Sequence, residues 1–194
     1  VAEQFGTLES LFPGRVDLGL GRAPGTDHAA TYALRRTLNA NPDAFPQDVM
    51  EVMDYFRTPQ PNQAVRAVPG GGLDVPIWIL GASTLGAQVA AALGLPFAFA
   101  SHFAPAMLDE ASRIYRERFK PSGQLNTPYL MLGVNVVAAE TEAEARFLAS
   151  SGRQSFAALR AGRPTTLPPP SKEWEREPSD TATVDQGRRV SFVG

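Results

Sequence analysis

Three short apolar runs, separated by segments of helical periodicity, constrain the fold of this chain more than any other feature. They are Val75 to Leu80, Pro96 to Ala100 and Tyr129 to Ala138. Runs of this kind are typical of strands that are covered on both faces, as in a parallel sheet. Arg15 to Leu20 alternates polar and apolar residues and also indicates a strand. Four strands joined by helices predict parallel pairing through right-handed crossovers.

Helix signals occupy the gaps between these strands. Pro46 suits the first turn of a helix, Gly94 suits a helix end, and Thr141 to Glu144 has the capping-box spacing. We expect helices over residues 2–12, 29–38, 46–56, 84–93, 107–119 and 141–159. The segment from Arg163 to Pro170 is too rich in proline to be regular.

The alternation of strands and helices predicts an α/β fold of the (β/α)8 TIM-barrel type, with an open doubly wound sheet as the alternative. A complete barrel takes about 250 residues and eight strands, whereas this chain has 194 residues. We therefore expect a single partial barrel domain over residues 1–194, with residues 163–194 as an irregular C-terminal part. The chain starts at Val1 within a helical pattern, which predicts a fragment. Exposed apolar edges of an incomplete barrel predict self-association into a homo-oligomer.

Composition excludes several classes of function. The formal net charge of -2 argues against a nucleic-acid partner. The apolar runs, including Leu93 to Ala100, are far shorter than the ~20 residues that span a bilayer, so we expect no membrane association. The absence of cysteine excludes disulfides, zinc thiolates and cysteine nucleophiles, and it fits a cytoplasmic protein. The two histidines lie too far apart in sequence for a metal-ligand motif, so no metal site is expected.

The first glycine-rich turn, Gly19 to Gly25, directly follows a predicted strand. Its glycines would let the backbone approach a phosphate, and Arg22 could bind the phosphate with two hydrogen bonds. Pro24 removes a donor from the turn, and Asp43 lies in a turn and not at a strand end, so a Rossmann site is disfavoured. A strand-end loop that needs glycine only for its geometry explains the pattern equally well.

The second turn, Gly81 to Gly86, leads from a buried strand into a helix. Unpaired amides and the positive end of the helix dipole can bind an anion there. Ser83 could donate to a phosphate oxygen, or it could simply cap the helix. Both turns follow the carboxyl ends of strands, where α/β folds bind their ligands. His102 also follows a strand, so it either lies near a bound ligand or is a structural histidine.

Several segments, in this order, resemble the bacterial luciferase-like flavin-dependent monooxygenase family, and most strongly its uncharacterised oxidoreductase branch. The resemblance extends to about Pro170. The segments are Ala2 to Glu9, Pro13 to Arg22, Pro76 to Ser83, Ala91 to Pro96, Phe99 to Phe103 and Val134 to Ala138.

The resemblance implies a (β/α)8 barrel of which this chain holds the fourth to seventh strands, without the first three and the eighth. It also implies that Arg22 and Ser83 hold the flavin phosphate, together with Gly21 and the amides near Ala82 and Gly86. Luciferases proper have a cysteine where Gly21 stands, so thiol-dependent behaviour cannot apply here. The segment from Arg163 to Pro170 takes the place of a mobile lid that shields reduced flavin from water.

The chemistry implied by the resemblance is oxidation by a flavoprotein. Reduced FMN reacts with molecular oxygen at its C4a position and oxygenates a small organic substrate, and a flavin reductase is an expected partner. The cofactor supplies this chemistry, and the protein supplies orientation and a dry pocket. We expect no covalent catalytic residue. Two alternatives remain: a non-catalytic flavin-binding or truncated structural remnant of the same fold, and an oxidoreductase that uses the deazaflavin F420.

Overall fold

The computed structural model describes residues 1–22, 44–163, 165–175 and 191–193. The chain divides into two compact units, Val1–Phe99 with Asp109–Met131 and Ala100–Leu108 with Leu132–Gly194, and each is described by itself. The helix expected over residues 29–38, as well as Pro24 and Asp43, lies outside the described residues. The single-domain organisation of residues 1–194 stays a prediction.

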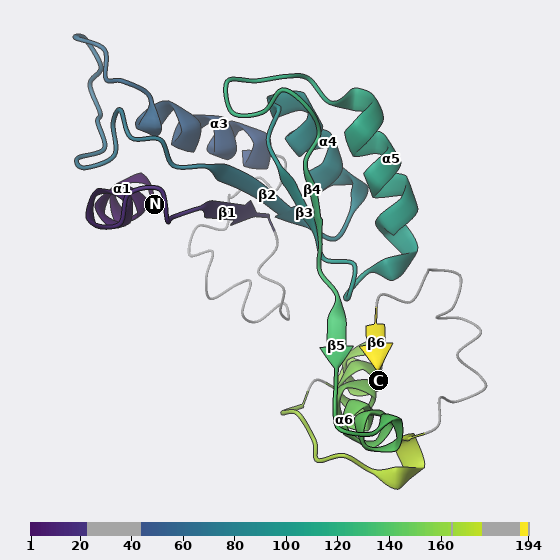
Figure 1. Ribbon diagram of the computed structural model, residues 1–194. Coiled ribbons are helices and arrows are strands. Elements are labelled where there is room, and N and C mark those ends of the chain that lie inside the picture. The colour runs from purple at the N-terminus through teal and green to yellow at the C-terminus, as the bar shows by residue number, and fades with distance from the viewer. Residues whose placement is uncertain (23–43, 164, 176–190, 194) are drawn as a thin grey trace. The chain divides into compact units, whose positions relative to one another are not determined.

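The first unit is built on a sheet with the strand order β1-β2-β3-β4 (Figure 1). Its strands are β1 (Leu18–Gly21), β2 (Ile77–Gly81), β3 (Phe97–Phe99) and β4 (Leu130–Leu132). β1 pairs with β2 in parallel, with Gly21 opposite Leu80, and β2 pairs with β3 in parallel, with Gly81 opposite Phe99. The α/β architecture with parallel pairing is therefore confirmed, and the carboxyl ends of β1, β2 and β3 lie along one edge of the sheet.

Local signals set the helix boundaries of this unit. The helices are α1 (Ala2–Leu11), α3 (Phe45–Phe56), α4 (Thr84–Leu93) and α5 (Leu108–Arg118). The short 3-10 helix η2 (Pro105–Met107), which precedes α5 in the sequence, belongs to the second unit. Pro46 lies in the first turn of α3, where a missing N–H costs nothing. α4 ends at Gly94, whose φ of 66° lies in the left-handed region that glycine adopts easily.

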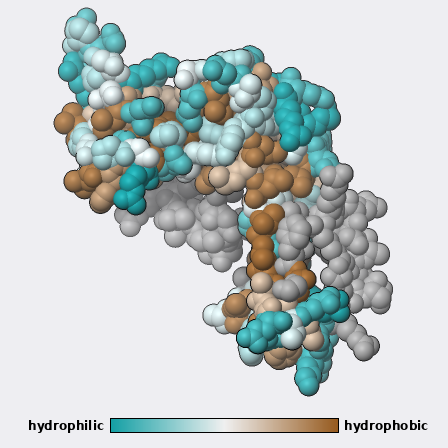
Figure 2. All heavy atoms as spheres, viewed as in Figure 1, coloured by the Kyte–Doolittle hydropathy of each residue, from teal (hydrophilic) through white to brown (hydrophobic). Residues whose placement is uncertain are grey.

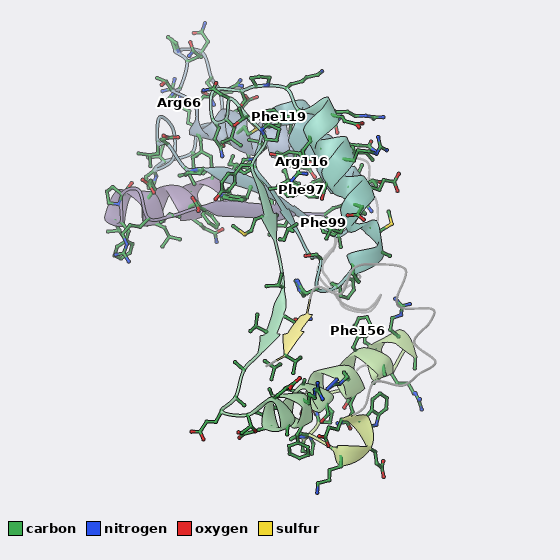
Figure 3. All side chains as sticks on the ribbon, turned by 45° about the vertical axis from the view of Figure 1, so that its right-hand side comes forward. Arg66, Phe97, Phe99, Arg116, Phe119 and Phe156 are labelled. Atoms are coloured by element: carbon green, nitrogen blue, oxygen red, sulfur yellow. The ribbon has the colours of Figure 1, made fainter. Side chains whose placement is uncertain are left out.

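One face of the sheet packs against α4 and α5. The Phe97 ring lies 5.6 Å from the ring of Tyr115 in α5, and both side chains are fully buried. The Tyr115 hydroxyl donates to the carbonyl of Leu95 at 2.8 Å and accepts from the N–H of Tyr129 at 3.0 Å. Figure 3 shows Phe97 and Phe119 between the strands and α5. This aromatic layer is the core that fixes the strands relative to the helices.

The opposite face carries the side chains that alternate with the buried ones. Ile77 and Ile79 are buried, whereas Leu80 is 44% exposed. Because successive side chains of a strand point to opposite faces, Trp78 and Leu80 share the second face. The Trp78 and Tyr129 rings meet there edge to face at 5.5 Å. We call this second face, defined by Gly19, Gly21, Trp78, Leu80 and Tyr129, the open face of the sheet.

The second unit consists of a parallel pair of strands and one long helix. β5 (Asn135–Val137) pairs with β6 (Ser191–Val193), and α6 (Glu142–Arg160) is followed by η3 (Lys172–Trp174). The predicted cap of α6 is present, because the Thr141 hydroxyl accepts from the N–H of Glu144 at 3.2 Å. No helix or strand lies in the described residues between Arg163 and Pro170, as expected.

The apolar run from Tyr129 to Ala138 was expected to form one strand, and this prediction is wrong. β4 and β5 are separate strands in separate sheets, divided at Gly133. The Gly133 carbonyl accepts from the Ser101 hydroxyl at 2.6 Å and from the His102 N–H at 2.9 Å. Met131 and Val136 are exposed, and Figure 2 shows in brown the apolar side chains that reach the surface.

Candidate functional site

The two glycine-rich turns emerge side by side at one edge of the sheet. Gly21 and Leu80 are register partners in neighbouring parallel strands. One residue further along each chain segment, Arg22 directly after β1 and Gly81 at the end of β2 therefore lie at the same edge. Gly21 and Arg22 are both exposed. The parallel pairing thus brings the predicted residues Gly21 and Arg22 close to the turn that contains Ala82 and Ser83.

The amino end of α4 offers donors that the helix itself does not use. Ser83 occupies the N-cap position with φ -146° and ψ 171°, and its side chain makes no capping hydrogen bond. The amides of the first helical turn, at Thr84, Leu85 and Gly86, have no acceptor inside a helix. They lie at the positive end of the helix dipole. The simpler interpretation of Ser83, a side-chain cap, is therefore not observed, and its exposed hydroxyl can face a ligand.

Gly86 has a packing role in addition to its predicted cofactor role. A Cβ at residue 86 would lie 3.1 Å from Cε2 of Phe97, and a Cβ at residue 81 would lie 3.5 Å from Cα of Gly86. Gly86 therefore lets the first turn of α4 sit directly against Phe97 of β3, whereas a Cβ at residue 81 would make only ordinary contact. This close approach carries the amides of α4 to the edge where Arg22 lies.

The chemistry of these groups fits a phosphate. A guanidinium, a serine hydroxyl and several amides at a helix amino end are all donors, and together they favour a dianion over a neutral ligand. No carboxylate occurs among Gly21, Arg22 or residues 81–86, so no acidic side chain of these turns opposes an anion. That these residues bind a cofactor phosphate stays a prediction.

His102 belongs to the second unit. It follows Ser101, which is fully buried, and its own side chain is exposed. The imidazole ring lies against Gly133, in the space that a Cβ at residue 133 would fill. The predicted contact of His102 with flavin or substrate stays a prediction.

Sequence reasoning missed two residues of functional interest, Leu80 and Gly133. Leu80 was assigned to a buried strand, and nothing local indicates that the face it lies on is exposed. Gly133 interrupts an apolar run, and a glycine inside a strand pattern is a known signal of a break or of a close approach.

The described residues also bear on two other classes of site. They hold no group of three or more His, Cys, Asp or Glu side chains that could bind a metal ion. Within the same residues, no helix has the length and apolar character that crossing a membrane requires.

Comparison with known proteins identifies several relatives of the chain. The family described as luciferase-like monooxygenase matches residues 1–189. A luciferase-like monooxygenase of Escherichia coli (strain K12) is 50% identical over the whole chain, which covers 58% of that protein. The uncharacterised protein YvbT of Bacillus subtilis is 48% identical, again over the whole chain and 58% of the relative. The chain thus spans somewhat more than half the length of these relatives.

Solved structures give the same result. The crystal structure of apo-MsnO8 superposes with a TM-score of 0.85 at 31% identity, over the whole chain and 59% of the other protein. The monooxygenase RslO1 of Streptomyces bottropensis shares the fold, with a TM-score of 0.57 at 19% identity over 84% of this chain and 53% of that protein. These neighbours confirm the TIM-barrel type of the fold, here as an incomplete barrel. The chain belongs to the luciferase-like monooxygenase family.

Proposed function

We propose that this chain supplies the phosphate-binding part of a flavin-dependent monooxygenase that uses FMN. One observation carries the proposal. Arg22 directly follows β1, the amino end of α4 follows β2, and these two strands are neighbours in register. Family membership supports the oxidoreductase class. One relative, 33% identical over 84% of this chain and 50% of its own length, is the N-acetyl-S-alkylcysteine monooxygenase of Bacillus subtilis. The proposed co-substrates are molecular oxygen and a small organic molecule, and a flavin reductase would provide reduced cofactor.

Each residue of the site has a defined task in this proposal. Arg22 would neutralise the phosphate charge, and the amides of Thr84, Leu85 and Gly86 would orient the phosphate oxygens. The Ser83 hydroxyl would donate one further hydrogen bond. A bound reduced flavin would supply the electrons for the oxygenation, while these side chains bind and position it without exchanging protons with the substrate.

The proposal is tested by titrating FMN into the full chain and into an Arg22→Ala variant. Loss of a charge-assisted hydrogen bond typically costs about 1.5–3 kcal/mol, so we expect affinity to fall by roughly tenfold to a hundredfold. Arg15→Ala is the matched control, because this exposed arginine precedes β1 and lies beyond the opposite end of the same strand. Equal affinity of wild type and Arg22→Ala would remove Arg22 from the site and refute the proposal.

The same protein sample can test two alternative functions, an F420-dependent oxidoreductase and a non-catalytic flavin-binding protein. The fold also occurs in an F420-dependent secondary alcohol dehydrogenase, with a TM-score of 0.53 at 16% identity over 98% of this chain and 61% of that protein. Titration with F420 beside FMN therefore decides which flavin binds more tightly. Oxygen consumption in the presence of FMN and a reductant distinguishes a catalyst from a non-catalytic flavin-binding protein.

A further inference from the structure

A tryptophan and a tyrosine are in direct contact on the first unit's sheet. Trp78 lies in β2, Tyr129 directly precedes β4, and their rings meet edge to face with centroids 5.5 Å apart. Indole and phenol rings are among the side chains that give up one electron most readily to a strong oxidant. An electron passes between two rings in contact without an intermediate carrier. The pair therefore offers a path for a one-electron oxidation in addition to its packing energy.

The sheet holds both members of this pair in place. Trp78 lies within β2, opposite Gly19 of β1. The N–H of Tyr129 donates to the Tyr115 hydroxyl at 3.0 Å, and its carbonyl accepts from the N–H of Phe97 at 3.0 Å. The ring contact is thus set by backbone hydrogen bonds and does not depend on a chance meeting of two surface side chains.

The direction of electron transfer follows from the release of a proton. A phenol that loses an electron also loses its proton, because the phenol radical cation is a very strong acid. Tyr129 is 56% exposed, so water can take that proton. Trp78 is only half-buried, so a small oxidant can reach it. An oxidation that starts at Trp78 therefore ends at Tyr129, since the neutral tyrosyl radical is the product of lower energy.

Tyr115 is bonded to Tyr129 but is not suited to the same role. Its side chain is fully buried, and its hydroxyl donates to the Leu95 carbonyl at 2.8 Å. A carbonyl oxygen is too weak a base to take a phenolic proton. Burial also raises the pKa of Tyr115 above its ordinary value, because an apolar environment disfavours the charged form. Tyr115 therefore keeps its proton and its electron.

We propose that Trp78 and Tyr129 form a redox pair that carries a one-electron oxidation from the sheet to solvent. Trp78 gives one electron to a strong one-electron oxidant, which is thereby reduced. Trp78 then takes one electron from Tyr129, whose phenolic proton passes to water, and the products are neutral Trp78 and a neutral tyrosyl radical. In the cell, the oxidants of this class would be oxygen-derived radicals. Only this source rests on the proposed function, because the ring contact exists without it.

The experiment follows both radicals by their absorption after pulse radiolysis of the full chain in azide solution. Azide radicals take one electron from tryptophan in preference to tyrosine and become azide ions. The chain has two tryptophans, so a Trp174→Phe background leaves Trp78 as its only indole. We expect the indolyl band to decay as the tyrosyl band rises, at a rate that does not depend on protein concentration.

Two variants in this background test the acceptor. Tyr129→Phe keeps the ring and removes only the hydroxyl, so it should fold like its parent and lose the concentration-independent conversion. Tyr55→Phe is the matched control, because Tyr55 lies in α3 and its hydroxyl donates to Glu51. It should convert at the parent's rate. Absence of the conversion in the parent, its persistence in Tyr129→Phe or equal losses in both variants would overturn the proposal. Because this experiment contains no flavin, its outcome is independent of the FMN titration that tests the proposed function.

Discussion

Two apolar runs of similar sequence character have opposite environments in this protein. In β2, Ile77 and Ile79 are buried, and α4 packs against that side of the sheet through Gly81 and Gly86. In the run from Tyr129 to Ala138, Met131 and Val136 are exposed, and the strand is interrupted at Gly133. The comparison shows that an apolar run can predict a strand. Whether its side chains are buried depends on which helices pack against that strand.

Truncating one buried and one exposed side chain should give the largest difference in the free energy of unfolding. Phe97 is fully buried between β3 and α5, and its ring contacts Phe99 and Tyr115. Phe97→Ala should lower the free energy of unfolding by about 3–5 kcal/mol, because it leaves a cavity in the core. Val136 is 64% exposed, so Val136→Ala should change this free energy by less than about 0.5 kcal/mol. Urea denaturation of both variants measures the difference, and similar losses would contradict the contrast.

The next effect concerns the hydroxyl of Tyr115 in α5, which bonds to backbone groups just before β3 and β4. Tyr115→Phe leaves the Leu95 carbonyl and the Tyr129 N–H without their partner. We expect the free energy of unfolding to fall by about 1–3 kcal/mol, because buried polar groups lose their hydrogen bonds. Tyr55→Phe is the matched control, since the Tyr55 hydroxyl donates to the exposed Glu51 at the surface, and its loss should be smaller. An equal loss in both variants would show that the Tyr115 hydroxyl does not join these elements.

The same hydroxyl also predicts a dependence on pH. Burial raises the pKa of Tyr115 above its ordinary value near 10. A group whose pKa is raised in the folded state stabilises the fold below its unfolded pKa, and this stabilisation is lost as the pH rises through the folded value. The wild type should therefore lose stability above about pH 10, and Tyr115→Phe should lose less over that window. Urea midpoints measured between neutral and alkaline pH test the sign.

A smaller effect is expected at the break between β4 and β5. Gly133→Ala places a Cβ where the His102 ring lies, and because this ring is exposed and can turn away, the cost should be about 0.5–1.5 kcal/mol. Gly123→Ala is the control, because nothing lies within 4 Å of its Cβ position and neither glycine has a positive φ. The NMR signals of the His102 ring should shift in Gly133→Ala and not in Gly123→Ala. Unchanged signals in both would show that Gly133 does not position the ring.

Those parts of the fold that depend on local chemistry could be predicted from the sequence. Pro46, Gly94 and Thr141 each act within one turn of the backbone, and the helices begin or end near them as expected. The break at Gly133 could not be predicted in the same way, because its carbonyl bonds to Ser101, 32 residues away in sequence. Contacts at such separation depend on the assembled fold and leave no periodic signal.

The candidate site, too, could be predicted from the sequence only in part. Arg22 and Ser83 could be placed at one edge of the sheet from the order of strands and turns alone, because parallel strands end at the same edge. Sequence reasoning could not decide whether the Ser83 hydroxyl caps α4, since that depends on a side-chain orientation. Leu80 was missed because its exposure depends on which elements cover the open face.

The smallest effect compares the interior glycines of two helices, Gly152 in α6 and Gly86 in α4. In α6, a Cβ at Gly152 would meet nothing within 4 Å, so Gly152→Ala should stabilise the protein by about 0.5–1 kcal/mol by restricting the unfolded chain. In α4, the same change at Gly86 brings a methyl group to 3.1 Å from the Phe97 ring, so Gly86→Ala should be destabilising. The sign of the substitution therefore reports whether a helical glycine lies against a neighbouring element. If urea denaturation shows both variants to be stabilised, α4 does not sit against β3 as closely as the glycine pair at residues 81 and 86 indicates.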